Sequence, residues 1–554
     1  MKKLKYSILG LFISSIGLFT SCEADFEDIN RSPATVYEVD PVTFLHNVQL
    51  AASKAGSTWM DSYATKLRWM QYCSNIWGYS QTNFTDIGIG GAMYSEYDEM
   101  GSYATHIKYY IEQNMPDELN AYSDLIEVSR IMLIYKGIHT SDTYGSLVYS
   151  EGWGTKNGNP DLVDPVYQTQ EELYTVWNTE LKEAANKLGS SNGQKSIANY
   201  DHAYSGDTGK WIKAANALRL RIALRLLKRA PETAKSIATD VLGSGNIFQG
   251  VDDSFILYFD NNWTTNGDWH SVIDMDRASA PFMDYLTRYD DPRKRLFFQI
   301  NNLTPENIAR YNDEQTNPNL DIPVGTTQWE GGTVSFDERA TDANYIARTL
   351  SDGTDMRAMN KPQTRLWKGA QDGGSGGGWV PMLTYADFCF MASEFALEGV
   401  SSSKSAQEWY EEGVRASLKQ WSEIAEYSQI NNFMAITDAE IDAFMAQTDI
   451  AWNPAIAKEQ IYSQSWVEHF KNNNESWAMW RRTGFPNQNT TVVTFDPVMV
   501  LGQEQNIPRR KKFTFPAEGT ANYQNKVQGL ETMAADPEFG DVTNEFGRLW
   551  WDKQ

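Results

Sequence analysis

Apolar residues recur at helical spacing in the segment 170–188. They form one stripe on a helix of 3.6 residues per turn, while glutamate and lysine fill the opposite face. Thr169 precedes the segment as an N-cap followed by acidic residues, and Gly189 follows it as a stop signal. The pattern predicts an amphipathic helix whose buried stripe contains Leu173, Tyr174, Trp177, Leu181, Ala184, Ala185 and Leu188.

The same spacing recurs along much of the chain. Because helices follow one another closely between residues 122 and 243, the sequence predicts antiparallel helix pairs of the tetratricopeptide type, although no repeat of about 34 residues is visible. The expected fold class is all-α, with tetratricopeptide-like helix pairs and a large irregular region rich in loops. The further predicted helices are 122–138, 210–227, 232–242 (after the start signal Pro231), 384–398, 405–421, 438–447 and 455–471.

Two regions lack this periodicity. Residues 244–380 are rich in asparagine, glycine, aspartate and aromatic residues, and residues 487–554 are punctuated by prolines. The glycine-rich stretch 373–378 is expected to be a flexible loop, since no P-loop lysine or Rossmann pattern accompanies it. The helical scaffold is therefore expected mainly in 41–243 and 384–482, and the loop-rich part in 244–380 and 487–554.

The N-terminal segment has the layout of a bacterial secretory signal. Three lysines within the first five residues precede an apolar stretch that ends at Phe19, and small residues then lead to Cys22. A cysteine at the cleavage point indicates a lipoprotein signal, in which Cys22 becomes the lipidated first residue. The alternative is an ordinary signal peptide that is cut elsewhere and leaves Cys22 as a free thiol.

The lipoprotein interpretation divides the chain into three parts. Residues 1–21 are the signal peptide, residues 22–39 form a flexible tether, and residues 40–554 form a single domain. No second apolar run approaches the length of a membrane span, so attachment to a membrane would depend on the lipid.

The charge of the chain excludes one class of partner. The net charge is −24, and removal of residues 1–21 with their three lysines makes it −27. Such an acidic surface repels nucleic acid, so we expect no nucleic-acid partner.

The two remaining cysteines are Cys73 and Cys389, both in apolar text. Two buried thiols are one interpretation, because free cysteine behaves as a small apolar residue. A disulfide between them is the other, since secreted proteins meet an oxidising environment.

The sequence offers no catalytic signature. It has six histidines without metal-ligand spacing, no His-Glu-x-x-His motif and no Gly-x-Ser-x-Gly motif. With 72 acidic residues, pairs of carboxylates arise by chance and do not identify a glycosidase dyad. We expect neither a catalytic residue nor a cofactor, although scattered oxygen ligands would allow a structural calcium ion.

Aromatic residues in loop segments are the candidates for ligand contact. The chain contains 19 Trp, 28 Tyr and 24 Phe, and several lie beside asparagine, glycine or aspartate rather than in helical text. A flat aromatic ring stacks on the apolar face of a sugar, while nearby amides and carboxylates bind its hydroxyls. The candidate ligand-binding residues are Trp77, Tyr79 and Asn83; Trp263, Asp268 and Trp269; and Trp329.

Several segments, in order, resemble one family. The chain is similar to SusD/RagB-type outer-membrane lipoproteins over nearly its whole mature length, with Val148 where the family's hallmark has proline. The matching segments are Ser141-Asp-Thr-Tyr-Gly145 with Tyr149-Ser-Glu151, Asp164-Pro-Val-Tyr167, Asp207 through Lys210-Trp211 to Asn216 and Arg221, Asp291-Pro-Arg293, Ala386 to Glu398, Trp466, Trp477 to Pro486, Ile507 to Arg510, and Arg548 to Asp552.

The resemblance implies a function. Such proteins are lipid-anchored at the outer membrane, exposed on the cell surface, and capture glycans for a SusC-like TonB-dependent transporter. The resemblance also implies that Lys210, Trp211, Asn216, Arg481 and Arg482 belong to the scaffold rather than to the ligand site. Two alternatives stay open at this point: a peptide-binding member of the same family, and an α-helical glycoside hydrolase.

Overall fold

A computed structural model describes residues 39–52, 63, 65–74, 84, 92–259, 273, 276–323, 325–368 and 376–554. Contacts between Cα atoms divide the chain into two units, residues 1–43 and residues 44–554. The described part of the first unit contains the 3-10 turn η1 (Pro41–Thr43). All other elements belong to the second unit.

Helix α8 (Gln170–Lys187) forms where the apolar stripe predicts it. The Thr169 hydroxyl accepts a hydrogen bond from the Glu172 backbone N–H, and the Glu172 carboxylate accepts one from the Thr169 backbone N–H at 2.8 Å. This capping box satisfies N–H groups that have no partner within the helix. Leu173, Tyr174 and the rest of the predicted stripe are buried except Ala185.

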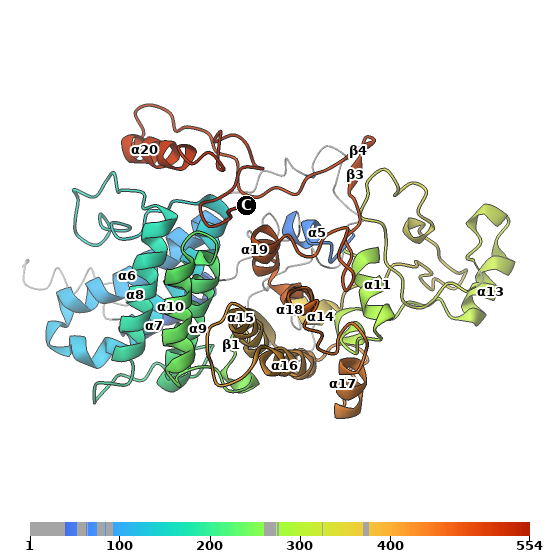
Figure 1. Ribbon diagram of the computed structural model, residues 1–554, viewed down its shortest axis with the longest axis horizontal. Coiled ribbons are helices and arrows are strands. Elements are labelled where there is room, and N and C mark those ends of the chain that lie inside the picture. Colours follow the sequence, from blue (N-terminus) through green and yellow to red (C-terminus); the bar gives the residue numbers. More distant parts are fainter. Residues whose placement is uncertain are drawn as a thin grey trace, which may run out of the picture. The chain divides into compact units, whose positions relative to one another are not determined.

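Successive helices pack side by side in the first half of this unit (Figure 1). Helix α6 packs on α7, α7 on α8, α8 on α9 and α9 on α10, while α3 packs on α6 and α7. This arrangement agrees with the predicted helix pairs, and it also contains a helix, α6, that the periodicity did not indicate. The elements are α3 (Phe44–Leu50), α6 (Ala92–Asn114), η3 (Pro116–Tyr122), α7 (Ser123–Tyr144), α9 (Thr208–Leu226) and α10 (Pro231–Gly243).

A second group of helices follows strand β2 (Gly378–Leu383), which pairs in antiparallel orientation with β1 (Phe255–Phe259). Helix α15 packs on α16 and α18 and also contacts α9, so it joins this group to the helix pairs. The helices of this group are α15 (Tyr385–Leu397), α16 (Ala406–Tyr427), α17 (Asp438–Met445), α18 (Ala457–Glu468), the 3-10 turn η9 (His469–Lys471) and α19 (Asn473–Thr483).

The two regions expected to be loop-rich contain more regular structure than the sequence predicts. Their helices are short, and three of them begin at a proline or just before one, where the side chain of Ser279, Thr304 or Asn317 caps the first turn. Except for α20, these helices have fewer than three turns, which is too short for a recognisable apolar period. These elements are α11 (Ala280–Arg288), α12 (Lys294–Phe297), α13 (Pro305–Glu314), η7 (Pro318–Leu320), η8 (Ala343–Tyr345), α14 (Thr364–Lys368), β3 (Met499–Val500), β4 (Gln503–Glu504) and α20 (Tyr523–Ala534).

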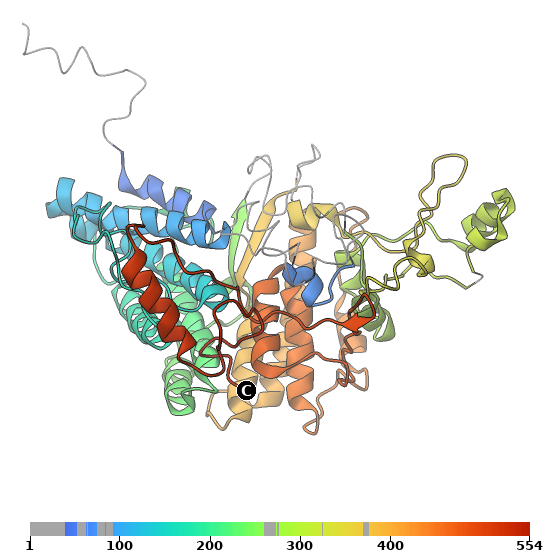
Figure 2. The same cartoon turned by 90° about the horizontal axis from the view of Figure 1, so that it is seen from above.

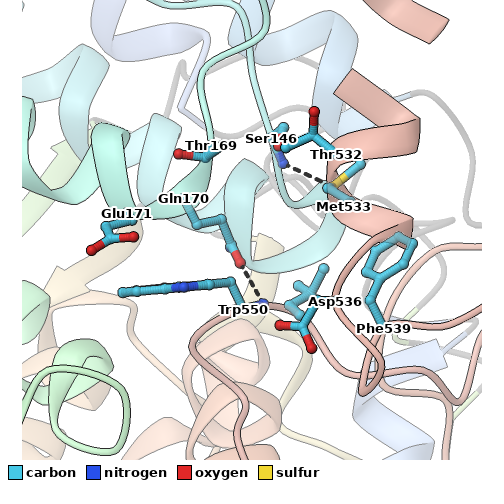
Figure 3. A pocket seen from close by; sticks show the side chains of 10 residues that line it. Ser146, Thr169, Gln170, Glu171, Thr532, Met533, Asp536, Phe539 and Trp550 are labelled. Atoms are coloured by element: carbon cyan, nitrogen blue, oxygen red, sulfur yellow. Dashed lines mark hydrogen bonds between the residues drawn. The ribbon is translucent and has the colours of Figure 1, made fainter. Parts of the chain in front are cut away.

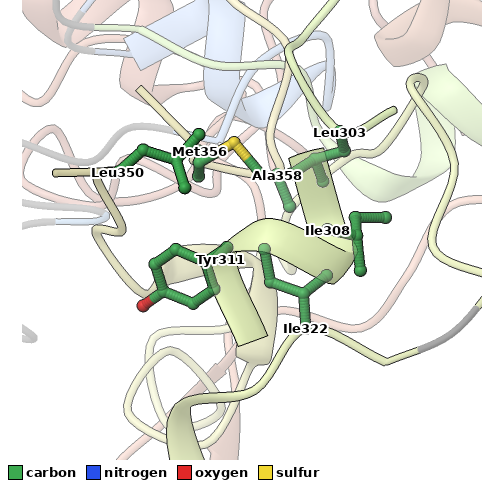
Figure 4. Packing of buried hydrophobic residues seen from close by; sticks show 7 residues of the cluster. All are labelled: Leu303, Ile308, Tyr311, Ile322, Leu350, Met356 and Ala358. Carbon is green, nitrogen blue, oxygen red and sulfur yellow. The ribbon is translucent and has the colours of Figure 1, made fainter. Parts of the chain in front are cut away.

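Part of this region has a small core of its own. Apolar side chains from α13 and the segments around it pack together, as Figure 4 shows. In Figures 1 and 2 this lobe lies on the side of the unit opposite the helix pairs α6–α10. The cluster consists of Leu303, Ile308, Tyr311, Ile322, Leu350, Met356 and Ala358.

The main core is rich in tryptophan and in buried ion pairs. Asp142, which belongs to the family-like segment Ser141-Asp-Thr-Tyr-Gly145, binds Arg225 at 3.0 Å. Arg482 binds Glu394 in a bidentate pair at 2.5 and 2.7 Å. Arg481 donates to the backbone oxygens of Asp142 and Arg509. These contacts confirm that the two arginines anchor the scaffold. The remaining short elements are α5 (Leu67–Trp69), η4 (Ala198–Tyr200) and η5 (Val251–Asp253).

Among the described residues, the helices are too short or too polar for any to cross a bilayer.

Candidate ligand-binding region

The structure describes one of the predicted ligand-binding residues, Trp329. The other six and the predicted lipidation site lie outside the described residues, and these are Trp77, Tyr79, Asn83, Trp263, Asp268, Trp269 and Cys22. The region is therefore defined by the chain segments that lead into and out of the predicted loops.

Those segments meet. Cys73 forms an antiparallel bridge with Ala278, and the Ser74 backbone N–H donates to the Arg277 oxygen at 2.8 Å. Ser279 forms a parallel bridge with Gly332, three residues after Trp329. The chain entering the first predicted loop thus lies beside the chain leaving the second and beside the third.

Side chains strengthen this junction. The Ser74 hydroxyl donates to the Thr333 oxygen at 2.6 Å and also contacts the Tyr345 hydroxyl. The Asn344 amide donates to the Gly331 oxygen at 2.8 Å. Three segments that are up to 259 positions apart in the sequence are therefore held together by backbone and side-chain hydrogen bonds.

Glycine is required where the third segment crosses the second. A Cβ atom on Gly331 would lie 2.2 Å from the Ser279 oxygen, which is backbone and does not move easily. The adjacent Gly332 donates to the Ala278 oxygen at 2.9 Å and accepts from the Ala280 N–H at 2.8 Å. The missing side chains allow this close backbone approach.

Trp329 is half-buried immediately before these glycines. The Lys294 ammonium of α12 lies 5.4 Å from the centre of its indole, within the range of a cation–π contact. The Thr327 hydroxyl donates to the Trp329 oxygen at 2.8 Å, which fixes the backbone there. A sugar that stacks on the face of the indole near Lys294 would have to displace the ammonium.

Asp276, a buried carboxyl group with three arginines near it, directly precedes the junction residues Arg277 and Ala278. Asp276 is fully buried, and one of its oxygens accepts from the Arg277 backbone N–H at 2.9 Å. Burial raises the pKa of Asp276 to about 7, although Arg68, Arg277 and Arg339 act in the opposite direction. Burial and then Asp276 also raise the pKa of the Cys73 thiol.

Phe336 connects these charges to the aromatic side chains. The guanidinium groups of Arg68 and Arg339 lie 5.0 and 4.3 Å from its ring centre, and Phe84 meets it edge-on at 6.4 Å. The sequence did not single out these residues, because no motif links positions that are about 250 residues apart.

The cysteine alternatives are resolved by the structure. Cys73 and Cys389 are both free and buried. Cys73 lies in the bridge to Ala278 rather than in a helix, and Cys389 lies in α15.

The described residues contain no group of three or more histidine, cysteine, aspartate or glutamate side chains that could hold a metal ion.

One cavity, of about 140 Å³, lies in the scaffold between α8 and α20. Figure 3 shows the Trp550 indole along one side, Met533 and Phe539 on the other, and Gln170 between them. The Gln170 side-chain oxygen accepts from the Trp550 backbone N–H at 3.0 Å, and the Asp536 carboxylate binds Arg229 at 2.5 Å. Because these polar groups are already paired, we interpret the contacts as attachment of the C-terminal segment to the helix pairs.

The similarity of this chain to known proteins covers both its sequence and its fold. A model of the SusD-like family, described as "Starch-binding associating with outer membrane", matches residues 33–516. The chain belongs to the SusD-like family. No curated protein sequence matches it.

Solved SusD-like structures share the fold. A chitin-binding protein superposes with a TM-score of 0.71 at 22% identity, covering 93% of this chain and 100% of that one. A chitin-binding SusD homolog from Flavobacterium johnsoniae gives 0.64 at 21% identity, with 92% and 98% covered. A SusD homolog from Bacteroides fragilis gives 0.68 at 19% identity, with 93% and 100% covered.

Membership of the family decides the general class of function. The protein is a SusD-like nutrient-binding protein associated with the outer membrane, and it is not an enzyme. The glycoside hydrolase alternative is therefore wrong.

Proposed function

We propose that this protein is a surface-exposed lipoprotein that captures glycans and delivers them to a SusC-like TonB-dependent transporter. The observation that carries the proposal is the junction of Ser74, Ala278 and Gly332, where segments flanking the three groups of predicted aromatic residues are hydrogen-bonded to one another. Loops that start from one junction can present their side chains to one ligand.

The chemistry of those loops favours a sugar. Trp77, Trp263, Trp269 and their neighbours combine flat apolar rings with amide and carboxylate groups, which suits a ligand with apolar ring faces and hydroxyl edges. A modest affinity is sufficient, because a binder held beside its transporter raises the local concentration of the ligand. The family description names starch and two similar structures are described as chitin-binding, so these two glycans are the first to test.

The ligand-binding assignment is tested by replacing the proposed contact residues. The Trp77→Ala and Trp263→Ala variants are titrated with maltohexaose, chitohexaose and other oligosaccharides in a calorimeter. We expect a loss of at least about tenfold in affinity for the glycan that binds, equivalent to about 1.4 kcal/mol. Trp452→Ala is the matched control, since Trp452 is half-buried between α17 and α18 and is not one of the predicted ligand-binding residues.

Unchanged affinity in both loop variants would refute the assignment of these residues. A wild-type protein that binds peptides and no oligosaccharide would instead support the peptide-binding alternative.

The lipid anchor is tested separately. A Cys22→Ala protein is expected to fold and bind its glycan, but not to support uptake by cells, because the glycan-binding protein must stay beside its transporter. Normal growth of Cys22→Ala cells on the glycan as sole carbon source would contradict the proposed role of the anchor.

A further inference from the structure

A second cavity opens among the C-terminal segments, and it has a volume of about 420 Å³. Its walls come from Gln71, the end of α19, the segment 487–498, the segment 504–509 that begins in β4, and Phe546. Trp329, the predicted ligand-binding residue that the structure describes, is not among the described residues that line it. Its volume is within the range of about 300–1,000 Å³ that small-ligand sites occupy.

Aromatic rings form part of this wall. Trp480 is half-buried, Phe495 is buried, and the Phe546 side chain remains 38% exposed at the edge. Apolar surface that is exposed to water is unfavourable in free energy. A ligand with an apolar face that covered the Phe546 ring would remove this surface from water.

Three polar side chains that line the cavity make no hydrogen bond within the described protein, and of these Asp496 and Asn506 are exposed and Trp480 is half-buried. Within the described part of the chain, the Trp480 indole N–H, the Asp496 carboxylate and the Asn506 side-chain amide have no hydrogen-bond partner. Burial and then Asp284 and Glu338 raise the pKa of Asp496, as expected for a carboxyl group without a cation beside it. Donors and acceptors are thus both available next to flat apolar rings.

The backbone that carries Asp496 is held in place. The Gln71 side-chain N–H donates to the backbone oxygen of Asp496 at 2.7 Å, and the Gln71 side-chain oxygen accepts from the Asp496 backbone N–H at 2.9 Å. Gln71 is 2% exposed and has a positive φ of 53°, so the pair is built into the core rather than formed by a surface side chain.

The hairpin before Asn506 is held in a similar way. The Asp337 carboxylate accepts from the N–H groups of Leu501 and Gly502 at 2.8 and 2.7 Å. Across the cavity edge, the Gln488 amide donates to Glu504 of β4. The polar groups therefore come from rigid supports, which lowers the entropic cost of binding.

The charges around the cavity select among ligands. Asp496 and Glu504 are acidic, and the one lining arginine, Arg509, binds Asp552 in a bidentate pair at 2.7 and 2.6 Å. The Arg509 guanidinium also lies 5.1 Å from the Trp480 ring centre. An anionic ligand would meet two carboxylates and an arginine that is already neutralised.

We propose that this cavity is a second saccharide-binding site, which takes a neutral pyranose ring of a glycan with Trp480 and Phe546 against its apolar face and Asp496 and Asn506 on its hydroxyls. The site extends the proposed function, on which it rests for the class of ligand. It would let one protein hold a long glycan at two points, and two linked contacts raise the apparent affinity without any stronger single contact.

The test separates the two sites. In the Trp77→Ala/Trp263→Ala background, maltohexaose and chitohexaose are titrated before and after adding Asn506→Ala and Phe546→Ala. We expect weak residual binding before the additions and at least a tenfold further loss after them. Phe515→Ala, which removes an exposed phenylalanine outside the cavity, is the matched control and should change nothing.

A crystal of the same background soaked with the bound oligosaccharide should show a sugar ring in the cavity. Loss of all binding in the loop variants alone would overturn the second site and leave the proposed function intact, whereas a wild-type protein that binds no oligosaccharide would overturn both. Equal binding of oligogalacturonate in the loop-variant background would contradict the preference for neutral sugars.

Discussion

The Arg225 guanidinium of α9 donates a hydrogen bond of 2.8 Å to the Glu475 carboxylate of α19, across 250 positions of sequence. Arg225 also binds Asp142 of α7 at 3.0 Å, and all three side chains are at most 5% exposed. The family motif containing Asp142 is therefore part of an ionic junction between the helix pairs and the second helical group. Its role is to hold the scaffold on which the loops are built.

The ionic junction around Arg225 predicts that a single conservative substitution has a large effect on the stability of the protein. Glu475→Gln removes a charge that faces Arg225 and also lies 3.5 Å from Arg221, leaving two buried guanidinium groups with less compensation. We expect a loss of about 3 kcal/mol in the free energy of unfolding, measured by chemical denaturation. The control is Asp442→Asn, which breaks an exposed pair with Arg415 and should cost less than about 1 kcal/mol. Equal effects of both substitutions would show that the junction is not important for stability.

The buried Asp276 predicts a pH dependence of stability. Its pKa of about 7 in the folded protein lies above the usual value of about 3.9, so the folded state holds this proton more tightly than the unfolded state does. The contribution of Asp276 is then fully present below about pH 4 and is lost as the pH rises through 7.

Asp276→Asn should remove this dependence, because the amide does not ionise and its oxygen can still accept from the Arg277 N–H. The stability of the variant relative to the wild type should rise by up to about 4 kcal/mol between pH 4 and pH 8. Unfolding curves across that range test the expectation, and a constant difference between the two proteins would contradict it.

Gly331 predicts a link between backbone packing and ligand binding. Gly331→Ala places a methyl group 2.2 Å from the Ser279 backbone oxygen. The segment that carries Trp329 must therefore move away from the segment that contains Ser279. We expect a lower melting temperature and weaker glycan binding. Gly243→Ala is the control, since a Cβ there meets nothing within 4 Å. Glycan affinity that is unchanged in Gly331→Ala would separate this junction from the binding site.

Sequence periodicity is easiest to recognise where a long apolar stripe and a side-chain cap occur together, although α7, α10 and α18 were predicted without a side-chain cap. Helix α8 has both, and its predicted end is within one residue of the observed one. Helix α20 has neither: of its twelve residues only Gly529 and Leu530 are buried, so the apolar spacing is too sparse to reveal it. Helices of one or two turns, such as the four-residue α12, were not predicted for a different reason, since they are too short to show an apolar period.

The junction of loops could not be predicted from residue types. The pairing of Cys73 with Ala278 and of Ser279 with Gly332 is made by backbone groups, which every residue except proline carries. Only the two adjacent glycines in Trp329-Glu-Gly-Gly gave a hint of close backbone approach. Trp480 shows the opposite difficulty, because it stands in a family motif interpreted as scaffold and nevertheless lines a cavity.

The free cysteines give a final prediction about the folded state. Cys73 and Cys389 are 1% and 0% exposed, and burial raises the pKa of both thiols well above the usual value, so neither accessible sulfur nor thiolate is available. In the Cys22→Ala protein, a thiol reagent such as Ellman's reagent should react with neither cysteine under native conditions and with both after denaturation. A reducing agent should leave the melting temperature unchanged, because no bond between the cysteines contributes to stability. Denatured protein that shows no thiols until it is reduced would contradict this assignment and restore the disulfide.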